Sequence, residues 1–126
     1  MLKIYHNPLC KKSREGLKYL QDKGLKFEII EYLKHPLNEK DLEQLLAKLN
    51  LNPVEIIRTQ EDYFKKNLKG KKFHDHELIR FIVEMPKLLK RPIIEKEYKA
   101  VIGDPVSNID SFLSSTNKNQ NHGNTY

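Results

Sequence analysis

Hydrophobic and polar positions at the start of the chain predict a strand, a helix and a second strand. Leu2 to Tyr5 reads as a short strand that Pro8 ends, because proline biases the residue before it away from the helical region. Between Lys11 and Lys23 the apolar side chains have helical spacing, and Gly24 is a natural C-terminal stop. Lys26 to Tyr32 is rich in β-branched and aromatic residues. The segment predicts a βαβ unit.

The middle of the chain predicts a helical insert at about residues 38–85. Asn38 is placed as the N-cap of a helix, with an acidic residue three positions later and leucines at helical spacing after it. Asn52 is placed to start a short helical turn, with proline at the first position of the turn. A polar stretch follows and runs to Lys72, and a further helix is expected from Asp75 to Glu84.

The C-terminal part of the chain predicts a hairpin, a helix and a tail. Pro92 to Glu95 and Tyr98 to Ile102 are β-rich and are separated by a connection of hairpin length. A last helix is expected around Val106 to Leu113. Residues 114–126 contain no aliphatic side chain, which predicts a disordered tail. The order of elements predicts one α/β domain over residues 1–113.

Length, charge and composition narrow the class of protein. A chain of 126 residues fits one domain, and its apolar runs are far shorter than the ~20 residues of a membrane-spanning helix. The N-terminus lacks the features of a secretory signal, so a cytoplasmic protein is expected. The net charge of +6 suits an anionic ligand, but no aromatic residue interleaves with the lysines between Lys65 and Lys72, which argues against a nucleic-acid groove. His74 and His76 lack a third ligand at a recognisable spacing, so no metal site is expected.

Cys10 is the only cysteine, so its chemistry is that of a lone thiol. It stands where a loop meets the first predicted helix, so the backbone N–H groups of Lys12 and Ser13 should point toward its sulfur, and the helix dipole adds positive potential. Four cationic or protonatable side chains lie within a few residues of it: His6, Lys11, Lys12 and Arg14. These features predict a lowered thiol pKa and a reactive thiolate, against the alternative of a small buried apolar residue.

Four further residues are candidates for the same site. His6 can orient or tune Cys10, although a histidine at a strand end is more often a satisfied polar group. Ser13 completes a Cys-x-x-Ser sequence, in which a hydroxyl can hydrogen-bond a thiolate but cannot form a disulfide with it. Arg58 and Arg91 each close an apolar turn instead of standing in a run of charges, and two anchored guanidinium groups suggest an oxyanion site.

Three segments together carry a family resemblance. They are Ile4 to Cys10 with Ser13, Ile56 to Arg58, and Leu88 to Ile94. In this order and spacing they resemble the glutaredoxin-coupled arsenate reductase family, collinearly over residues 1–113. The resemblance implies a thioredoxin-like mixed sheet with a helical insertion, with Cys10 as the nucleophile and with Arg58 and Arg91 binding the oxyanion.

The same resemblance implies a reaction cycle and its partners. In that family the cysteine thiolate attacks arsenate, glutathione displaces the arsenic to give a mixed disulfide, and glutaredoxin reduces the disulfide. Glutathione is therefore expected as a co-substrate and glutaredoxin as a partner of Cys10, with a small oxyanion as substrate, no bound cofactor and a monomeric chain.

The chain departs from the family pattern at one position. A third arginine normally precedes a proline after the last strand, and here Asp104 precedes Pro105. A carboxylate near a doubly charged oxyanion repels it, so weak arsenate binding is expected. The family's relatives supply two alternatives: a glutathione-dependent thiol reductase of another substrate, and an Spx-type regulator that binds RNA polymerase. Ser13 stands where such regulators usually have a second cysteine, which counts against a disulfide switch.

Overall fold

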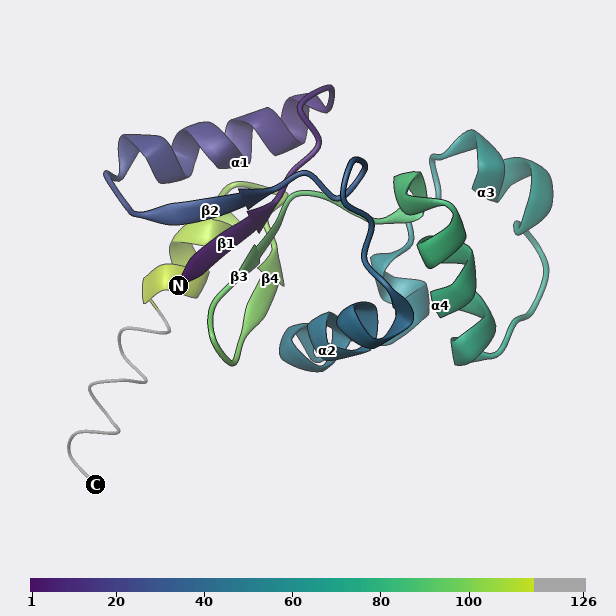
Figure 1. Ribbon diagram of the computed structural model, residues 1–126. Helices are drawn as coiled ribbons and strands as arrows, with labels where there is room; N and C mark the ends of the chain where they lie inside the picture. Colours follow the sequence, from purple (N-terminus) through teal and green to yellow (C-terminus); the bar gives the residue numbers. More distant parts are fainter. Residues whose placement is uncertain (115–126) are drawn as a thin grey trace.

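The computed structural model describes residues 1–114, in which four strands form one mixed sheet. β1 (Leu2–Tyr5) pairs in parallel with β2 (Phe27–Ile30) and antiparallel with β3 (Ile93–Glu95). The outer edge of β3 pairs antiparallel with β4 (Ala100–Ile102), so the strand order is β2-β1-β3-β4 (Figure 1). The predicted α/β class and mixed sheet are confirmed.

One face of the sheet is covered by α1 (Lys11–Asp22) and by the last helix, residues 107–114. Because successive side chains of a strand point to opposite faces, Ile4 of β1 and Ile94 of β3 face these helices. Their buried contacts form a small core of four residues: Ile4, Leu20, Ile94 and Ile109. Figure 1 shows α1 lying along this face.

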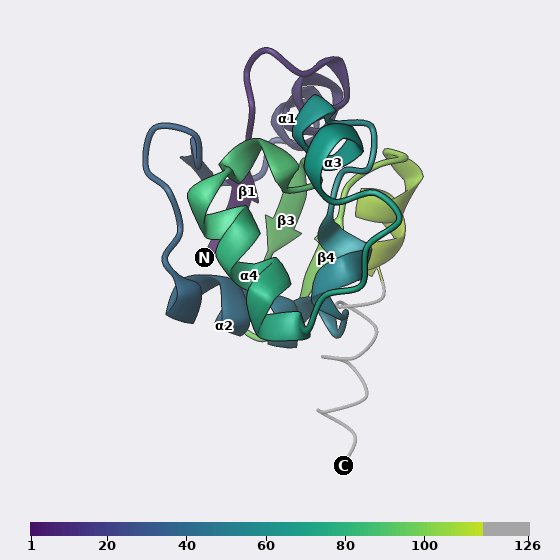
Figure 2. The same ribbon diagram turned by 90° about the vertical axis from the view of Figure 1, so that its right-hand side faces the viewer.

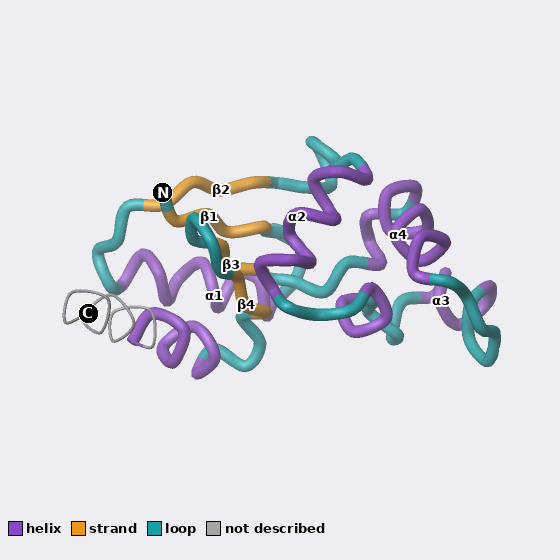
Figure 3. The backbone as a smooth tube through the Cα atoms, turned by 90° about the horizontal axis from the view of Figure 1, so that it is seen from below, coloured by secondary structure: helices purple, strands orange, loops and turns teal. Residues whose placement is uncertain are grey.

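The opposite face carries the larger core, built from the insert. Tyr5 and Ile93, the strand neighbours of the residues in the small core, pack with apolar side chains of α2 (Glu39–Leu49) and α4 (Asp75–Glu84). Figure 3 shows α2 lying against the sheet and α4 beyond its end. Seen from that end, α4 and α3 (Asp62–Asn67) lie in front of the strands (Figure 2). The insert therefore flanks the carboxyl ends of β1 and β2.

Most predicted helix starts are confirmed by their caps. The Asn38 side chain accepts a hydrogen bond from the Asp41 N–H at 2.7 Å, and the Asp41 carboxylate accepts from the Asn38 N–H, so both donors are satisfied. Asn52 precedes the 3₁₀ turn η1 (Pro53–Ile56), as expected. After α1 the chain turns at Gly24, which has the positive φ of +68° that glycine adopts without a steric cost.

The sequence prediction was wrong about one helix and about the ends of several other elements. The polar stretch before Lys72 contains the helix α3, whose pattern is hidden because none of its residues is buried. α1 ends at Asp22, β2 spans only Phe27–Ile30 and β4 begins at Ala100, so all three are shorter than expected. Ser114 belongs to the last helix, and the rest of the predicted tail lies outside the described residues.

No helix within residues 1–114 is both long enough and apolar enough to cross a bilayer.

Candidate active site

The loop after β1 holds Cys10 at the start of α1. The His6 N–H donates to the carbonyl of Ile30 at 2.9 Å, which continues the pairing of β1 with β2 by one residue. The Asn7 carbonyl then accepts from the Cys10 N–H at 3.0 Å, and its side-chain Oδ1 accepts from the Leu9 N–H at 3.0 Å. Cys10 is the N-cap residue of α1, with an extended backbone. The loop therefore presents the thiol at the helix N-terminus.

Two short turns bring the two candidate arginines together. η1 ends just before Arg58, and the 3₁₀ turn η2 (Pro86–Leu88) comes shortly before Arg91. The Arg58 N–H donates to the carbonyl of Leu88 at 2.7 Å, and the Lys90 N–H donates to the carbonyl of Ile56 at 2.9 Å. These bonds form a short antiparallel bridge between segments that are distant in sequence. The backbone thereby fixes both arginines at the same end of the sheet.

A close contact between α1 and Pro92 brings Arg91 toward the thiol. Gly16 faces Pro92 so closely that a Cβ atom built on Gly16 would lie 2.7 Å from Pro92 Cγ. The peptide bond between Arg91 and Pro92 is cis. Only a residue without a side chain lets the helix approach this far, so Gly16 sets the distance between the start of α1 and the arginine.

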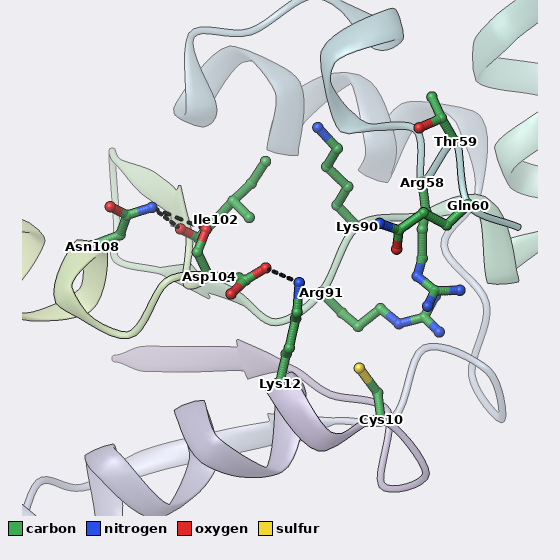
Figure 4. Close-up of a pocket in the computed structure, with 10 residues that line it drawn as sticks. All are labelled: Cys10, Lys12, Arg58, Thr59, Gln60, Lys90, Arg91, Ile102, Asp104 and Asn108. Carbon is green, nitrogen blue, oxygen red and sulfur yellow. Dashed lines mark hydrogen bonds and ion pairs between the residues drawn. The ribbon is translucent and has the colours of Figure 1, made fainter.

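The thiol and both arginines line one pocket of about 430 Å³. Figure 4 shows the Cys10 sulfur pointing toward the guanidinium groups of Arg58 and Arg91. The ten residues that line the pocket are Cys10, Lys12, Arg58, Thr59, Gln60, Lys90, Arg91, Ile102, Asp104 and Asn108. Four of them are cationic and one is acidic, so the pocket suits an anion.

The environment of Cys10 favours its thiolate. Partial burial raises the pKa of the thiol, but hydrogen bonds from the Ser13 amide, the Arg91 side chain and the Lys12 amide, with the charge of Arg91, together lower it below its ordinary value. The expected direction and the role of the two amides agree with the structure. The cation that acts on the sulfur is Arg91, which comes from a distant segment, instead of the neighbouring lysines that the sequence suggested.

Each arginine is held by a different kind of partner. Arg58 Nη1 donates to Glu61 Oε2 at 2.7 Å, and the carboxylate is mostly buried. Arg91 Nη1 donates to the carbonyls of Lys87 and Leu89, at 2.9 and 3.3 Å. The guanidinium of Arg91 therefore keeps its full charge for the pocket, whereas that of Arg58 is partly neutralised.

The side chains of His6 and Ser13 hold the loop, and neither side chain hydrogen-bonds the sulfur. The His6 Nδ1 lies 2.7 Å from Ser13 Oγ, and the same oxygen accepts the Asn7 N–H at 2.9 Å. Burial lowers the pKa of His6. Ser13 is fully buried, and it reaches Cys10 through its backbone amide. The expected hydroxyl contact is thus replaced by an amide contact, because the hydroxyl binds the loop.

Asp104 lies in the pocket, as its place in the sequence suggested, but it is not a free carboxylate. Its Oδ2 atom pairs with Lys12 Nζ at 3.0 Å, and both side chains are at least one-third exposed. Figure 4 shows this ion pair across the pocket from Arg58. The two charges largely cancel at that edge, so repulsion of an anion is weaker than an isolated aspartate would cause.

Two residues of the site were missed by sequence reasoning. Glu61 follows Arg58 by three positions, and this acid–base spacing was the available signal. Tyr32 is 1% exposed, and the charges of Arg91, Cys10 and Arg58 act on its hydroxyl. Its place at the end of a β-rich run gave no sign of a polar role.

His74 and His76 stack on each other, and residues 1–114 contain no cluster of metal-ligating side chains.

The fold and the site define a thioredoxin-like protein with a single cysteine facing an anion pocket. The ArsC family model matches residues 5–112, and the chain belongs to this family.

Curated relatives and a solved structure agree with this assignment. The uncharacterized protein YfgD of Escherichia coli is 42% identical over 106 residues, which cover 82% of this chain and 89% of that protein. An arsenate reductase of Neisseria meningitidis is 35% identical over 114 residues, covering 89% and 97%. The solved arsenate reductase of Vibrio cholerae superposes with a TM-score of 0.77 at 37% identity, covering 82% of this chain and 90% of the other.

Proposed function

We propose that the chain is a single-cysteine oxyanion reductase that reduces arsenate with electrons from glutathione and glutaredoxin. The observation that carries this proposal is the meeting of a thiol of lowered pKa with two arginines in one pocket. The relatives that bear the name arsenate reductase support the substrate. The lone cysteine supports an external thiol as the reductant, because the chain has no second cysteine to form a disulfide.

The reaction begins with attack by the Cys10 thiolate on the arsenic of arsenate. A sulfur–arsenic bond forms, and one arsenate oxygen takes up protons and leaves as water. The thiolate of glutathione then attacks the Cys10 sulfur. A sulfur–sulfur bond forms while the sulfur–arsenic bond breaks, and its electron pair goes to arsenic, which leaves as arsenite. Two thiols are oxidised to one mixed disulfide, and arsenic gains two electrons.

Glutaredoxin returns the protein to its starting state. A glutaredoxin thiolate attacks the glutathionyl sulfur of the mixed disulfide and releases Cys10 as a thiolate. Cys10 is half-buried at the loop tip, and the adjacent Leu9 is 86% exposed, which leaves the sulfur approachable by a protein thiol. The proposed partner therefore reaches Cys10 from the loop side of the pocket.

The side chains of the pocket have separate roles in this proposal. Arg91 stabilises the thiolate before attack and the negative charge of the oxyanion during it. Arg58, held by Glu61, supplies a second guanidinium for the oxyanion. His6 and Ser13 keep the loop in place, so that the two amides of α1 face the sulfur.

The test is arsenate-dependent oxidation of NADPH in the presence of glutathione, glutaredoxin and glutathione reductase. The wild-type chain should support arsenate-dependent turnover, and Cys10→Ser should support none. Ser111→Ala is the control, because it removes a hydroxyl from an exposed position outside the pocket and should leave turnover unchanged. Absence of arsenate-dependent turnover in a wild-type protein whose Cys10 alkylates readily would contradict the proposal.

A second candidate is a glutathione-dependent thiol reductase with another substrate. Asp104, which stands where the family pattern has an arginine and lines the pocket, favours it. The same coupled assay with a glutathionylated peptide in place of arsenate distinguishes the two. Turnover of the peptide alone, lost in Cys10→Ser, would assign the second activity.

A further inference from the structure

Two buried side-chain polar atoms within residues 1–114 make no hydrogen bond: Tyr32 Oη and Arg91 Nε. A buried polar atom without a partner costs about 1–3 kcal/mol, so such atoms are rare in a folded protein. Here the two are complementary, since Nε–H is a donor and the tyrosine oxygen is an acceptor as well as a donor. Both also lie at the same place in the molecule.

Their proximity follows from the packing around η2. Leu89 lines a small apolar space together with Tyr32, and its carbonyl accepts a hydrogen bond from Arg91 Nη1 at 3.3 Å. Burial raises the pKa of Tyr32 to about 12, and Arg91 opposes that rise through its charge and through a hydrogen-bonding contribution of its side chain, which places the two groups close together. Tyr32 is buried and is not among the residues that line the pocket, but Arg91, Cys10 and Arg58 all act electrostatically on its hydroxyl.

Tyr5, another buried tyrosine, shows what a structural hydroxyl looks like in this chain. Its Oη donates to Glu95 Oε1 at 2.6 Å and so links β1 to β3. The Tyr32 hydroxyl makes no well-formed hydrogen bond of this kind; the side chain that acts on it is that of Arg91, at the pocket.

We propose that Tyr32 is a positioning residue, whose hydroxyl oxygen accepts the Arg91 Nε–H bond when that guanidinium closes on the thiolate or on an oxyanion. Two carbonyls already hold the Nη1 end of Arg91, so a bond at Nε fixes the plane of the group. Forming it removes both unsatisfied atoms at once. The inference rests on the proposed function in one respect, because it assumes that Arg91 serves the anion pocket.

Tyr32→Phe tests the inference, because it removes one oxygen and keeps the ring that fills the core. The rate of Cys10 alkylation by iodoacetamide is measured against pH, first alone and then with arsenate, phosphate or sulfate added. We expect the inflection to move to higher pH, with the rate at pH 7 falling about threefold or more. Protection by the oxyanions should weaken by a similar factor, and the thermal midpoint should stay the same or rise.

Tyr5→Phe is the matched control, since it removes the hydroxyl of a buried tyrosine that bonds Glu95 outside the pocket. It should lower the thermal midpoint and leave the alkylation profile unchanged. An unaltered profile in Tyr32→Phe would overturn the inference, as would equal shifts in both variants. If no oxyanion protects the wild-type thiol, the proposed function fails, and the inflection still decides the role of Tyr32.

Discussion

Two clusters of buried polar side chains lie in this small domain, and they differ in how completely their atoms are paired. In the first, the buried carboxylate of Glu95 accepts from Tyr5 Oη at 2.6 Å and pairs with Lys48 Nζ at 3.1 Å. In the second, around Cys10, Arg91 Nε and Tyr32 Oη make no well-formed hydrogen bond, although the Arg91 side chain acts on the Tyr32 hydroxyl. The first cluster joins α2 to the sheet, and the second faces a pocket.

The difference separates stability from function. A buried network whose members are all paired resists change, because removing one member leaves the others uncompensated. Unpaired donors beside a pocket lower the stability of the resting protein. When a ligand binds, however, they have no existing hydrogen bond to give up. The Glu95 cluster is therefore expected to govern unfolding, and the Cys10 cluster reactivity.

The largest expected effect is that of Arg91→Ala on catalysis. This change removes the charge and the hydrogen bond that lower the thiol pKa, and also one of the two proposed oxyanion ligands. Charge-assisted hydrogen bonds are worth about 1.5–3 kcal/mol, so kcat/KM for arsenate should fall about a hundredfold or more, with the alkylation inflection moving to higher pH. The free energy of unfolding should change little.

Arg80→Ala provides the control for this experiment. Arg80 is exposed and lies 3.9 Å from the Glu39 carboxylate, outside the pocket. Arg80→Ala and Arg91→Ala each remove one positive charge from the chain, so any general effect of net charge appears in both variants. Equal losses of kcat/KM would refute a specific role for Arg91.

The next effect in size is that of Glu95→Gln on stability. The neutral amide cannot compensate the Lys48 ammonium, and it accepts a weaker bond from Tyr5. We expect the free energy of unfolding to fall by about 2 kcal/mol in urea titrations, with the Cys10 alkylation profile unchanged. The exposed Glu97→Gln is the matched control and should be neutral. A shift in the thiol profile of Glu95→Gln would mean that the two clusters are coupled.

Alkaline pH should sharpen the same contrast. Burial and the Glu95 carboxylate raise the pKa of Tyr5 above its ordinary value of 10.0. Above pH 10 the unfolded chain loses the tyrosine proton while the folded chain keeps it, so this contribution to stability is present below pH 10 and is lost as the pH rises. For this one group, the free energy of unfolding falls by up to about 1.4 kcal/mol per pH unit.

Tyr5→Phe should flatten that alkaline decline in stability. Some of the decline should remain, because the pKa of Tyr32 is raised as well, to about 12. Urea unfolding between about pH 9 and pH 11, a range that spans the ordinary tyrosine pKa of about 10, measures the free energy of unfolding against pH for the wild type and for Tyr5→Phe. Parallel curves for the wild type and Tyr5→Phe would refute the assignment of the decline to Tyr5.

The sequence was sufficient for much of the fold because local signals agreed with the tertiary structure. The Asn38 cap, the proline of η1 and the turn at Gly24 each satisfy a local requirement, and the corresponding elements are found where expected. α3 was missed because a short helix without buried residues leaves little hydrophobic pattern.

The sequence could predict only those site residues whose type and position were unusual in the chain. Cys10 at a helix start and two isolated arginines were visible, and the pocket brings them together. Tyr32 was not visible, because an unpaired hydroxyl differs from an ordinary core tyrosine only in three dimensions. The pairing of Asp104 with Lys12 was equally hidden, because it joins the start of α1 to the segment after β4.

The smallest expected effect, that of Asp104→Asn, follows from this pairing. The change removes one negative charge and frees the Lys12 ammonium for the pocket. KM for arsenate should fall by about two- to fivefold with little change in kcat, and the gain should shrink at high salt because both side chains are well exposed. Lys12→Ala should act in the opposite direction, since it leaves the carboxylate unpaired. Stability should not change, as exposed ion pairs contribute little.

Asp22→Asn, which breaks the exposed pair with Lys18 away from the pocket, is the control. If Asp104→Asn and Lys12→Ala shift KM in the same direction, the pair acts through the local structure and not through its charge.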